Sequence, residues 1–157
     1  MVNKFQYTED LIKEGMKKNI SIKAYILVLI SILYGSYIVI KGLEQNVLKV
    51  FGIIFPLVVI FLLIIKINQS INIAIKQAYV TYGKLPIEMT VIIKDNIEVI
   101  TSESRRTISL DNVKSYKISE NLITITLDAY LMVFVKKDSF VEGTCQECIA
   151  LLDNICK

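Results

Sequence analysis

The sequence predicts an α+β membrane protein, in which a two-helix transmembrane hairpin is joined to a mostly antiparallel β domain closed by a C-terminal helix. Apolar residues make up 54% of the 157 residues and the mean hydropathy is +0.54, which is high for a soluble protein of this size. The apolar excess is concentrated in residues 24–65. From Glu88 onward apolar and polar residues alternate, as they do in strands with one buried face.

Two apolar runs, residues 24–40 and 47–65, form the predicted hairpin, and the polar segment 41–46 between them is short enough to make them antiparallel. The first run is charge-free and spans roughly 25 Å as a helix, close to the ~30 Å hydrocarbon core. The alternatives are two core helices of a soluble protein, or a secretory signal peptide in the first run. A domain this small could hardly bury two helices that are apolar all round. The first run also lacks an Ala-x-Ala-like cleavage site and is followed at once by a second run.

The lysines near the ends of the two runs predict the orientation, because cytoplasmic loops carry the excess of Lys and Arg. They are denser outside the hairpin than at its turn. Before the first run stand Lys13, Lys17, Lys18 and Lys23, after the second stand Lys66, Lys76 and Lys84, and near the turn stand Lys41 and Lys49. We therefore expect a multi-pass protein of the cell membrane with both termini in the cytoplasm.

Within the runs, Ser31 and Gly35 form a small-x-x-x-small pair, which lets a neighbouring helix approach closely. Pro56 follows Gly52 by one turn and favours a kink in the second helix. No ionisable residue lies in the middle of either run, where it would mark an ion or proton pathway. The pattern therefore favours helix packing over a pore.

The segments around the hairpin read as an N-terminal cytoplasmic strand and helix (residues 1–23), a helical linker (66–87) and a β domain (88–157). Thr8 is the predicted N-cap of the first helix, and Glu9 and Asp10 in its first turn are better explained by the helix dipole than as paired catalytic carboxylates. The expected strands cover residues 5–7, 89–93, 97–101, 106–109, 113–119, 122–127 and 130–135, and the expected helices cover 11–20, 68–79 and 144–156.

This order of parts resembles the bacterial YcxB-like proteins, which pair two membrane helices with a pleckstrin-homology-like (PH-like) domain. The resemblance covers nearly the whole chain and is carried by residues 5–10, 106–113 and 130–140. Family members often have Trp where this chain has Leu110, and Pro where it has Val135. The resemblance implies a PH-like fold for residues 88–157, to which residues 5–8 would add a strand. It implies no established activity.

The residue inventory gives no support to catalysis. The chain has no His, so neither a Ser-His-Asp nor a Cys-His arrangement can form. It also lacks the G-x-x-x-x-G-K-[ST] and G-x-G-x-x-G motifs that hold phosphates. We therefore expect a protein that is not an enzyme and that needs no cofactor.

A Cys-x-x-Cys pair, Cys145 and Cys148, begins the predicted C-terminal helix. A helix N-terminus lowers a thiol pKa, so the pair is compatible with a redox site. However, all three cysteines fall on the apolar stripe of that helix, where Cys packs as a small hydrophobe. Three thiols without His or a fourth Cys also make a poor zinc site. We expect core packing and no metal.

Six basic residues on or beside the predicted strands are the candidate site for lipid or partner binding: Arg105, Arg106, Lys114, Lys117, Lys136 and Lys137. Each would contribute roughly 1 kcal/mol near an anionic membrane. The alternative is a solvated face, balanced by Glu98, Glu103, Asp111 and Glu120. The net charge is only +3 and the charges are interleaved, which does not favour nucleic-acid binding.

These observations lead to the hypothesis of a non-enzymatic, membrane-anchored scaffold or interaction module. Its expected partners are membrane lipids and a protein, and a homo-oligomer is compatible with the sequence. One alternative is an oligomeric subunit of a membrane transport system, although the uncharged runs argue against it. Another is a redox enzyme that uses Cys145 and Cys148.

Overall fold

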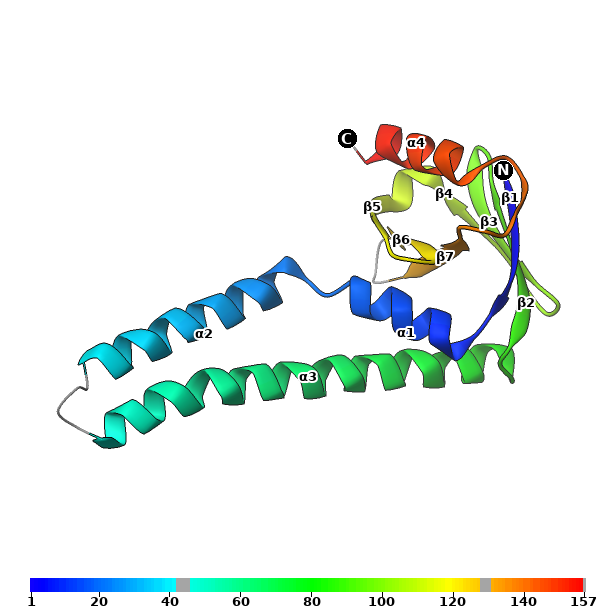
Figure 1. Cartoon of the computed structure of the whole chain (residues 1–157). Helices are drawn as coiled ribbons and strands as arrows, with labels where there is room; N and C mark the ends of the chain where they lie inside the picture. The colour runs from blue at the N-terminus through cyan, green and yellow to red at the C-terminus, as the bar shows by residue number, and fades with distance from the viewer. Residues whose placement is uncertain (42–45, 128–130, 157) are drawn as a thin grey trace. The chain divides into compact units, whose positions relative to one another are not determined.

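The computed structural model describes residues 1–41, 46–127 and 131–156 (Figure 1). The chain divides into two compact units. The αβ unit comprises Met1–Asn19 and Ile73–Lys157, and the hairpin unit comprises Ile20–Asn72. The first nineteen residues therefore belong to the same unit as the C-terminal half of the chain, although the whole hairpin separates them in the sequence.

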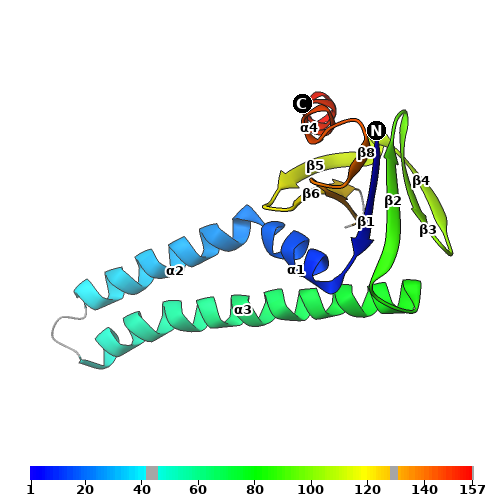
Figure 2. The ribbon, with the colours of Figure 1, turned by 45° about the vertical axis from the view of Figure 1, so that its right-hand side comes forward.

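Sheet A of the αβ unit is antiparallel and has the strand order β4-β3-β2-β1-β8. Its strands are β1 (Val2–Tyr7), β2 (Ile87–Ile93), β3 (Asn96–Thr101), β4 (Arg105–Ser109) and β8 (Phe140–Glu142). The N-terminal strand lies between β2 and β8, with Tyr7 opposite Ile87 and Val2 opposite Ile92 (Figures 1 and 2). The expectation that the N-terminal segment adds a strand is confirmed, but the strand begins at Val2 and not at Phe5, and Thr8 lies outside it as the N-cap of α1. Strand β8 was not expected.

Sheet B is antiparallel with the order β5-β6-β7. Its strands are β5 (Val113–Ile118), β6 (Leu122–Leu127) and β7 (Met132–Lys136), and a short 3₁₀ turn, η1 (Leu110–Asn112), leads into it. Strand β7 begins two residues later than predicted, and Tyr130, which was assigned to it, lies outside the described residues. The alternating apolar residues of β2, Met89, Val91 and Ile93, are all buried in the core, as their spacing predicts.

Two short helices complete the αβ unit. In α1 (Glu9–Lys18), Thr8 is the N-cap and its hydroxyl accepts a hydrogen bond from the Leu11 amide at 3.4 Å, as expected. The helix ends at Lys18, two residues before the predicted end, and Asn19 is its C-cap. In α4 (Cys145–Ile155), Thr144 and Glu147 form a capping box.

The apolar stripe predicted for the C-terminal helix faces the core. Cys148 and Leu152 are completely buried in the same cluster as the inner residues of both sheets. The Tyr116 hydroxyl of β5 donates a hydrogen bond to the Asp153 carboxylate of α4. This bond fixes the helix to sheet B at its exposed side.

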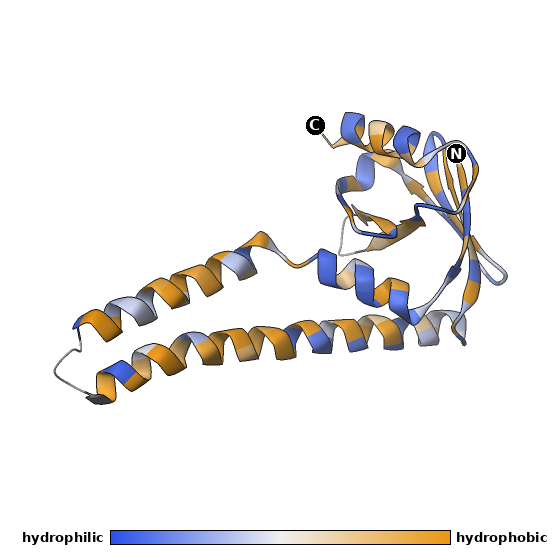
Figure 3. Cartoon of the chain, viewed as in Figure 1, coloured by the Kyte–Doolittle hydropathy of each residue, from blue (hydrophilic) through white to orange (hydrophobic). Residues whose placement is uncertain are grey.

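The hairpin unit contains α2 (Ile22–Lys41) and the apolar part of α3 (Asn46–Tyr82). Both helices are long and apolar enough to cross a membrane. Figure 3 shows hydrophobic residues along α2 and along the first half of α3, with polar residues more frequent in the second half of α3. The predicted second run and the linker after it form one continuous helix that ends at Tyr82. Residues 42–45, in the predicted turn, lie outside the described residues.

Candidate functional site

Helix α1 covers one face of sheet B. Thr124 and Phe134 are opposite each other on β6 and β7, and they point to the same face of the sheet. A Cβ atom on Gly15 of α1 would lie only 2.2 Å from Cε1 of Phe134, so the helix backbone rests directly on this ring. The Phe134 ring also stacks against Tyr7, with the ring centroids 5.9 Å apart. A glycine in mid-helix costs about 1 kcal/mol relative to Ala, and here it permits this close approach.

The Glu14 carboxylate attaches α1 to the turn between β5 and β6. It accepts hydrogen bonds from Ser119 Oγ at 2.5 Å, from the Asn121 amide at 2.9 Å and from Asn121 Nδ2 at 3.1 Å. Burial of the carboxylate by itself would raise the pKa of Glu14, but these hydrogen bonds and the nearby charge of Lys137 outweigh it and lower the pKa. Glu14 therefore stays ionised and holds the turn against α1.

Two further contacts hold α1 at its ends. The Tyr79 hydroxyl of α3 donates a 2.7 Å hydrogen bond to Glu9 Oε1 in the first turn of α1, and this bond raises the pKa of Tyr79. At the other end, Asn19 Nδ2 lies 3.4 Å from the Met132 sulfur of β7. Helix α1 is thus attached to α3 at its start and to sheet B along its length.

The C-terminal end of α1 presents basic and apolar side chains together. Lys17 and Lys18 are exposed and line an open groove of about 400 Å³ with Glu14, Ile118, Ser119 and Glu120. Ile118, at the end of β5, is 37% exposed. We call Lys17, Lys18 and Ile118 the α1-end surface. Its members come from two distant parts of the sequence, so no local pattern could have indicated it.

The six predicted basic residues are distributed over several edges. Arg105 and Arg106 lie on β4, the outer strand of sheet A, and Arg105 forms a 2.7 Å ion pair with Glu98. Sheet B carries Lys114 and Lys117 on β5 at one edge and Lys136 on β7 at the other. Lys137 follows β7 and acts electrostatically on Glu14. The structure therefore does not gather the six residues into one patch.

Asn3 joins the two sheets through its side chain. This residue of β1 is 1% exposed, its Nδ2 donates to the Lys136 carbonyl at 2.7 Å, and its Oδ1 accepts from the Lys136 amide at 3.0 Å. The side-chain amide thereby pairs with the β7 backbone as a neighbouring strand would. Both backbone polar groups of Lys136, at the end of β7, are therefore hydrogen-bonded to Asn3.

The two helices of the hairpin unit are in close contact at a pair of glycines. A Cβ atom on Gly35 would lie 2.4 Å from the Gly52 carbonyl oxygen, and one on Gly52 would lie 2.7 Å from the Gly35 carbonyl oxygen. Pro56 has no N–H to donate to the Gly52 carbonyl, so the usual helical hydrogen bond to this oxygen is missing, and the oxygen faces Gly35. Such backbone contacts allow weak Cα–H···O interactions. The small residues Ser31 and Gly35 are both buried on α2, and Ser31 Oγ donates to the Val28 carbonyl at 2.7 Å.

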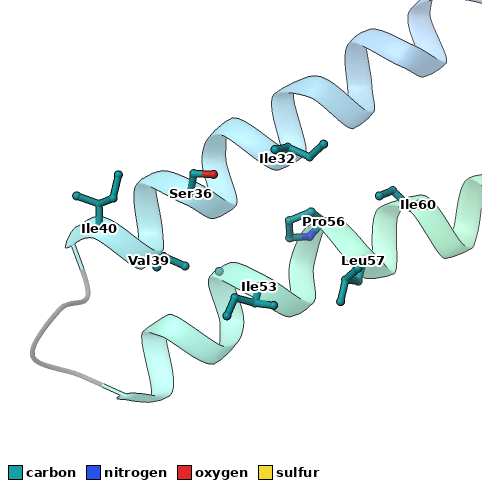
Figure 4. A pocket seen from close by; sticks show the side chains of 9 residues that line it. Ile32, Ser36, Val39, Ile40, Ile53, Pro56, Leu57 and Ile60 are labelled. Atoms are coloured by element: carbon teal, nitrogen blue, oxygen red, sulfur yellow. The ribbon is translucent and has the colours of Figure 1, made fainter.

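An apolar groove adjoins this crossing (Figure 4). It is open, its volume is about 440 Å³, and apart from Ser36 its lining is aliphatic, proline or glycine. The close-up shows Pro56 of α3 on the side facing α2, between the Ile53 and Ile60 turns. The lining residues are Ile32, Ser36, Val39, Ile40, Gly52, Ile53, Pro56, Leu57 and Ile60.

The cysteines of α4 are free thiols. Burial, together with neighbouring Cys145, raises the pKa of Cys148 to about 11, which disfavours the reactive thiolate at neutral pH. Cys145 and Cys156 are partly exposed. Among the residues that the structure describes, no group of His, Cys, Asp and Glu has the arrangement of a metal site.

Comparison of the chain with protein-family models, with curated proteins and with solved structures finds no match.

Proposed function

We propose that this chain is a two-span membrane protein that anchors the αβ unit at the cytoplasmic face as a non-enzymatic interaction module. The observation that carries the proposal is the contrast between the two units. The αβ unit buries its own apolar core. Among the described residues from 22 to 65, by contrast, twenty-four large apolar side chains are exposed.

Water is a poor solvent for such a surface. Soluble monomers rarely expose contiguous apolar patches beyond a few hundred Å². Here the exposed side chains surround both helices, and only 11% of the most apolar stretch of α2 and 6% of that of α3 are buried. Helix α2 has 20 residues and spans about 30 Å, which equals the hydrocarbon thickness of a typical bilayer. A bilayer therefore matches the apolar surface of both helices and the length of α2.

The pairing of β1 with β2 supports two crossings. Tyr7 and Ile87 are neighbours in sheet A, one before the hairpin unit and one after it. They must lie on the same side of any bilayer, so the chain between them crosses an even number of times. Two spans meet this condition and a single span does not. The excess of lysines outside the hairpin then favours the cytoplasmic side for the αβ unit.

The finer assignment to a YcxB-like protein with a PH-like domain belongs to this proposal too. It is supported by the sequence resemblance, by two antiparallel sheets and by a C-terminal helix whose apolar side enters the core. The interaction role is supported by a catalytically poor residue inventory, with no His in the chain.

Labelling with a membrane-impermeant maleimide in intact cells tests insertion and orientation. Gln45→Cys in the predicted turn should be labelled, and Glu103→Cys in the exposed β3–β4 turn should be labelled only after permeabilisation. The wild-type chain, with its own three cysteines, measures the background. Labelling of position 103 in intact cells would invert the orientation, and release of the protein by alkaline carbonate would overturn membrane insertion.

Flux through vesicles tests the alternative function. The purified chain, reconstituted in liposomes, should carry no ion or small-solute flux above protein-free liposomes, because the apolar runs hold no charged residue between positions 50 and 65 or between 24 and 40. Flux that depends on the protein would favour a transport subunit over an interaction module.

A further inference from the structure

We propose that the α1-end surface, made by Lys17, Lys18 and Ile118, binds the anionic lipid headgroups of the membrane that the hairpin crosses. The inference rests on the proposed function, because it requires α2 and α3 to lie in a bilayer. It adds a defined contact surface on the αβ unit and a defined ligand, the headgroup layer of the same membrane.

Chain connectivity brings this surface to the membrane. Only Asn19, Ile20 and Ser21 separate Lys18 from Ile22, the first residue of α2. Four Cα–Cα steps reach at most roughly 14 Å. Lys18 therefore stays within this distance of the start of the first span, whichever way the two units are oriented. The Lys side chain covers part of that distance, and the field of anionic lipids extends over about 8 to 10 Å.

The charges of the surface favour an anionic ligand. Of the two acidic residues that line the groove, Glu14 is already bound by three hydrogen bonds and by the charge of Lys137. Glu120 on the turn is the other. Lys17 and Lys18 therefore outweigh it, and Lys23 adds a further positive charge at the start of the span.

The apolar member of the surface fits the same ligand. Ile118 is a large side chain left exposed by a unit that buries most of its apolar residues. It lines the groove together with the two lysines. Basic side chains beside exposed apolar ones are typical of surfaces that lie in the headgroup region of a bilayer.

The predicted arginines of β4 are less suited to this contact. Arg105 is already paired with Glu98. Arg105 and Arg106 are also separated from the end of α3 by two strands and their turns, so connectivity does not hold them near a span. Arg106 therefore serves in the matched control.

Tryptophan fluorescence in the full-length chain provides the test, because the sequence has no Trp of its own. Three single reporters are made: Ile118→Trp in the α1-end surface, Val141→Trp on β8, where the side chain is 68% exposed, and Leu33→Trp in α2. Each protein is reconstituted in vesicles of phosphatidylcholine, or of two parts phosphatidylcholine to one part phosphatidylglycerol. Quenching is measured with headgroup spin-labelled lipid and with lipid brominated in the acyl chains.

We expect headgroup spin labels to quench the Ile118→Trp reporter strongly in the phosphatidylglycerol vesicles and weakly in phosphatidylcholine alone, and to leave the Val141→Trp reporter unquenched in both. Lys17→Gln with Lys18→Gln should lower the ratio of headgroup-bound to headgroup-free αβ unit, as reported by the Ile118→Trp reporter, roughly 30-fold. This corresponds to about 2 kcal/mol for two lysines. Lys94→Gln with Arg106→Gln removes the same charge from other exposed positions and should change the ratio less than threefold.

The reporter in α2 separates the two proposals. If brominated chains quench the Leu33→Trp reporter, but the Ile118→Trp reporter is quenched no more than the one on β8, the hairpin is inserted and the headgroup contact is refuted. If the reporter in α2 is not quenched, membrane insertion itself fails. Equal losses from the two double substitutions would show a general charge effect and would also refute the α1-end surface.

Discussion

Replacing Asn3 by Ala should lower the free energy of unfolding of the αβ unit by roughly 3 kcal/mol. The side chain satisfies both the N–H and the C=O of Lys136 at 3.0 Å and 2.7 Å, inside a site where Asn3 itself is 1% exposed. Leaving one buried backbone group without a partner costs about 1 to 3 kcal/mol. We take about 1.5 kcal/mol for each of the two groups, because water can reach partly buried Lys136.

Cys148 supplies the assay. Its side chain is completely buried in the core, so a thiol reagent modifies it only when the αβ unit opens. Where opening and closing are fast relative to labelling, the labelling rate is proportional to the open population. A loss of about 3 kcal/mol then accelerates labelling roughly 100-fold. Peptide mass spectrometry separates Cys148 from the partly exposed Cys145 and Cys156.

Asn96→Ala is the matched control. Asn96 is an exposed residue at the start of β3, and its backbone carbonyl accepts from the Lys94 amide, a bond that Ala retains. The control should change Cys148 labelling less than threefold. If Asn3→Ala also stays within threefold of the wild type, the amide does not connect the sheets and the reasoning fails.

Three other substitutions test contacts described above. The pKa of Glu14 is lowered on folding, so the stabilisation by its carboxylate is present above the unfolded pKa of about 4.3 and is lost as the pH falls below it. Glu14→Gln should therefore reduce the fall of the melting temperature at acid pH, measured by circular dichroism. An unchanged dependence of the melting temperature on pH would contradict this. Gly15→Ala gains about 1 kcal/mol of helix propensity but places Cβ 2.2 Å from the Phe134 ring. Overpacking costs about 1 to 3 kcal/mol, so the substitution should destabilise the αβ unit by roughly 1 kcal/mol. A rise in melting temperature would instead show that the Phe134 ring moves to accommodate the methyl group. Gly35→Leu must separate α2 from Gly52 of α3, and spin labels on the two helices should report an increased distance, while an unchanged distance would count against the glycine crossing.

Local patterns were sufficient for most of the individual elements. The charge-free run after Lys23 predicted α2, and the alternation at Met89, Val91 and Ile93 predicted β2, because burial of one helix or strand face leaves a periodic trace in the sequence. Strand β8 was missed for the opposite reason. It has three residues, none of them buried, and it exists because β1 offers it a partner.

The contacts that define the candidate site left no such trace. The alternation in β6 indicated one buried and one polar face, yet five of its six residues are buried. The difference comes from α1, which covers the face that carries Thr124. The contacts of Glu14 with Ser119 and Asn121 join residues more than one hundred positions apart. Periodicity reports that a face is covered, but it does not report which segment covers it.

The division of the αβ unit by the hairpin also constrains its biosynthesis. β1 lies between β2 and β8, so it cannot complete its pairing until the ribosome has passed Glu142. At about 5 to 20 residues per second, this takes on the order of ten seconds after β1 has been made. During that interval both apolar helices emerge. Strand β1 can pair with β2 once Ile93 has been made, but its edge toward β8 stays unpaired until Glu142 follows. If α2 and α3 cross the bilayer as proposed, sheet A can form only after the chain has returned to the side on which β1 lies. A polypeptide that inserted only one of the two helices would hold β1 and β2 on opposite sides of the bilayer.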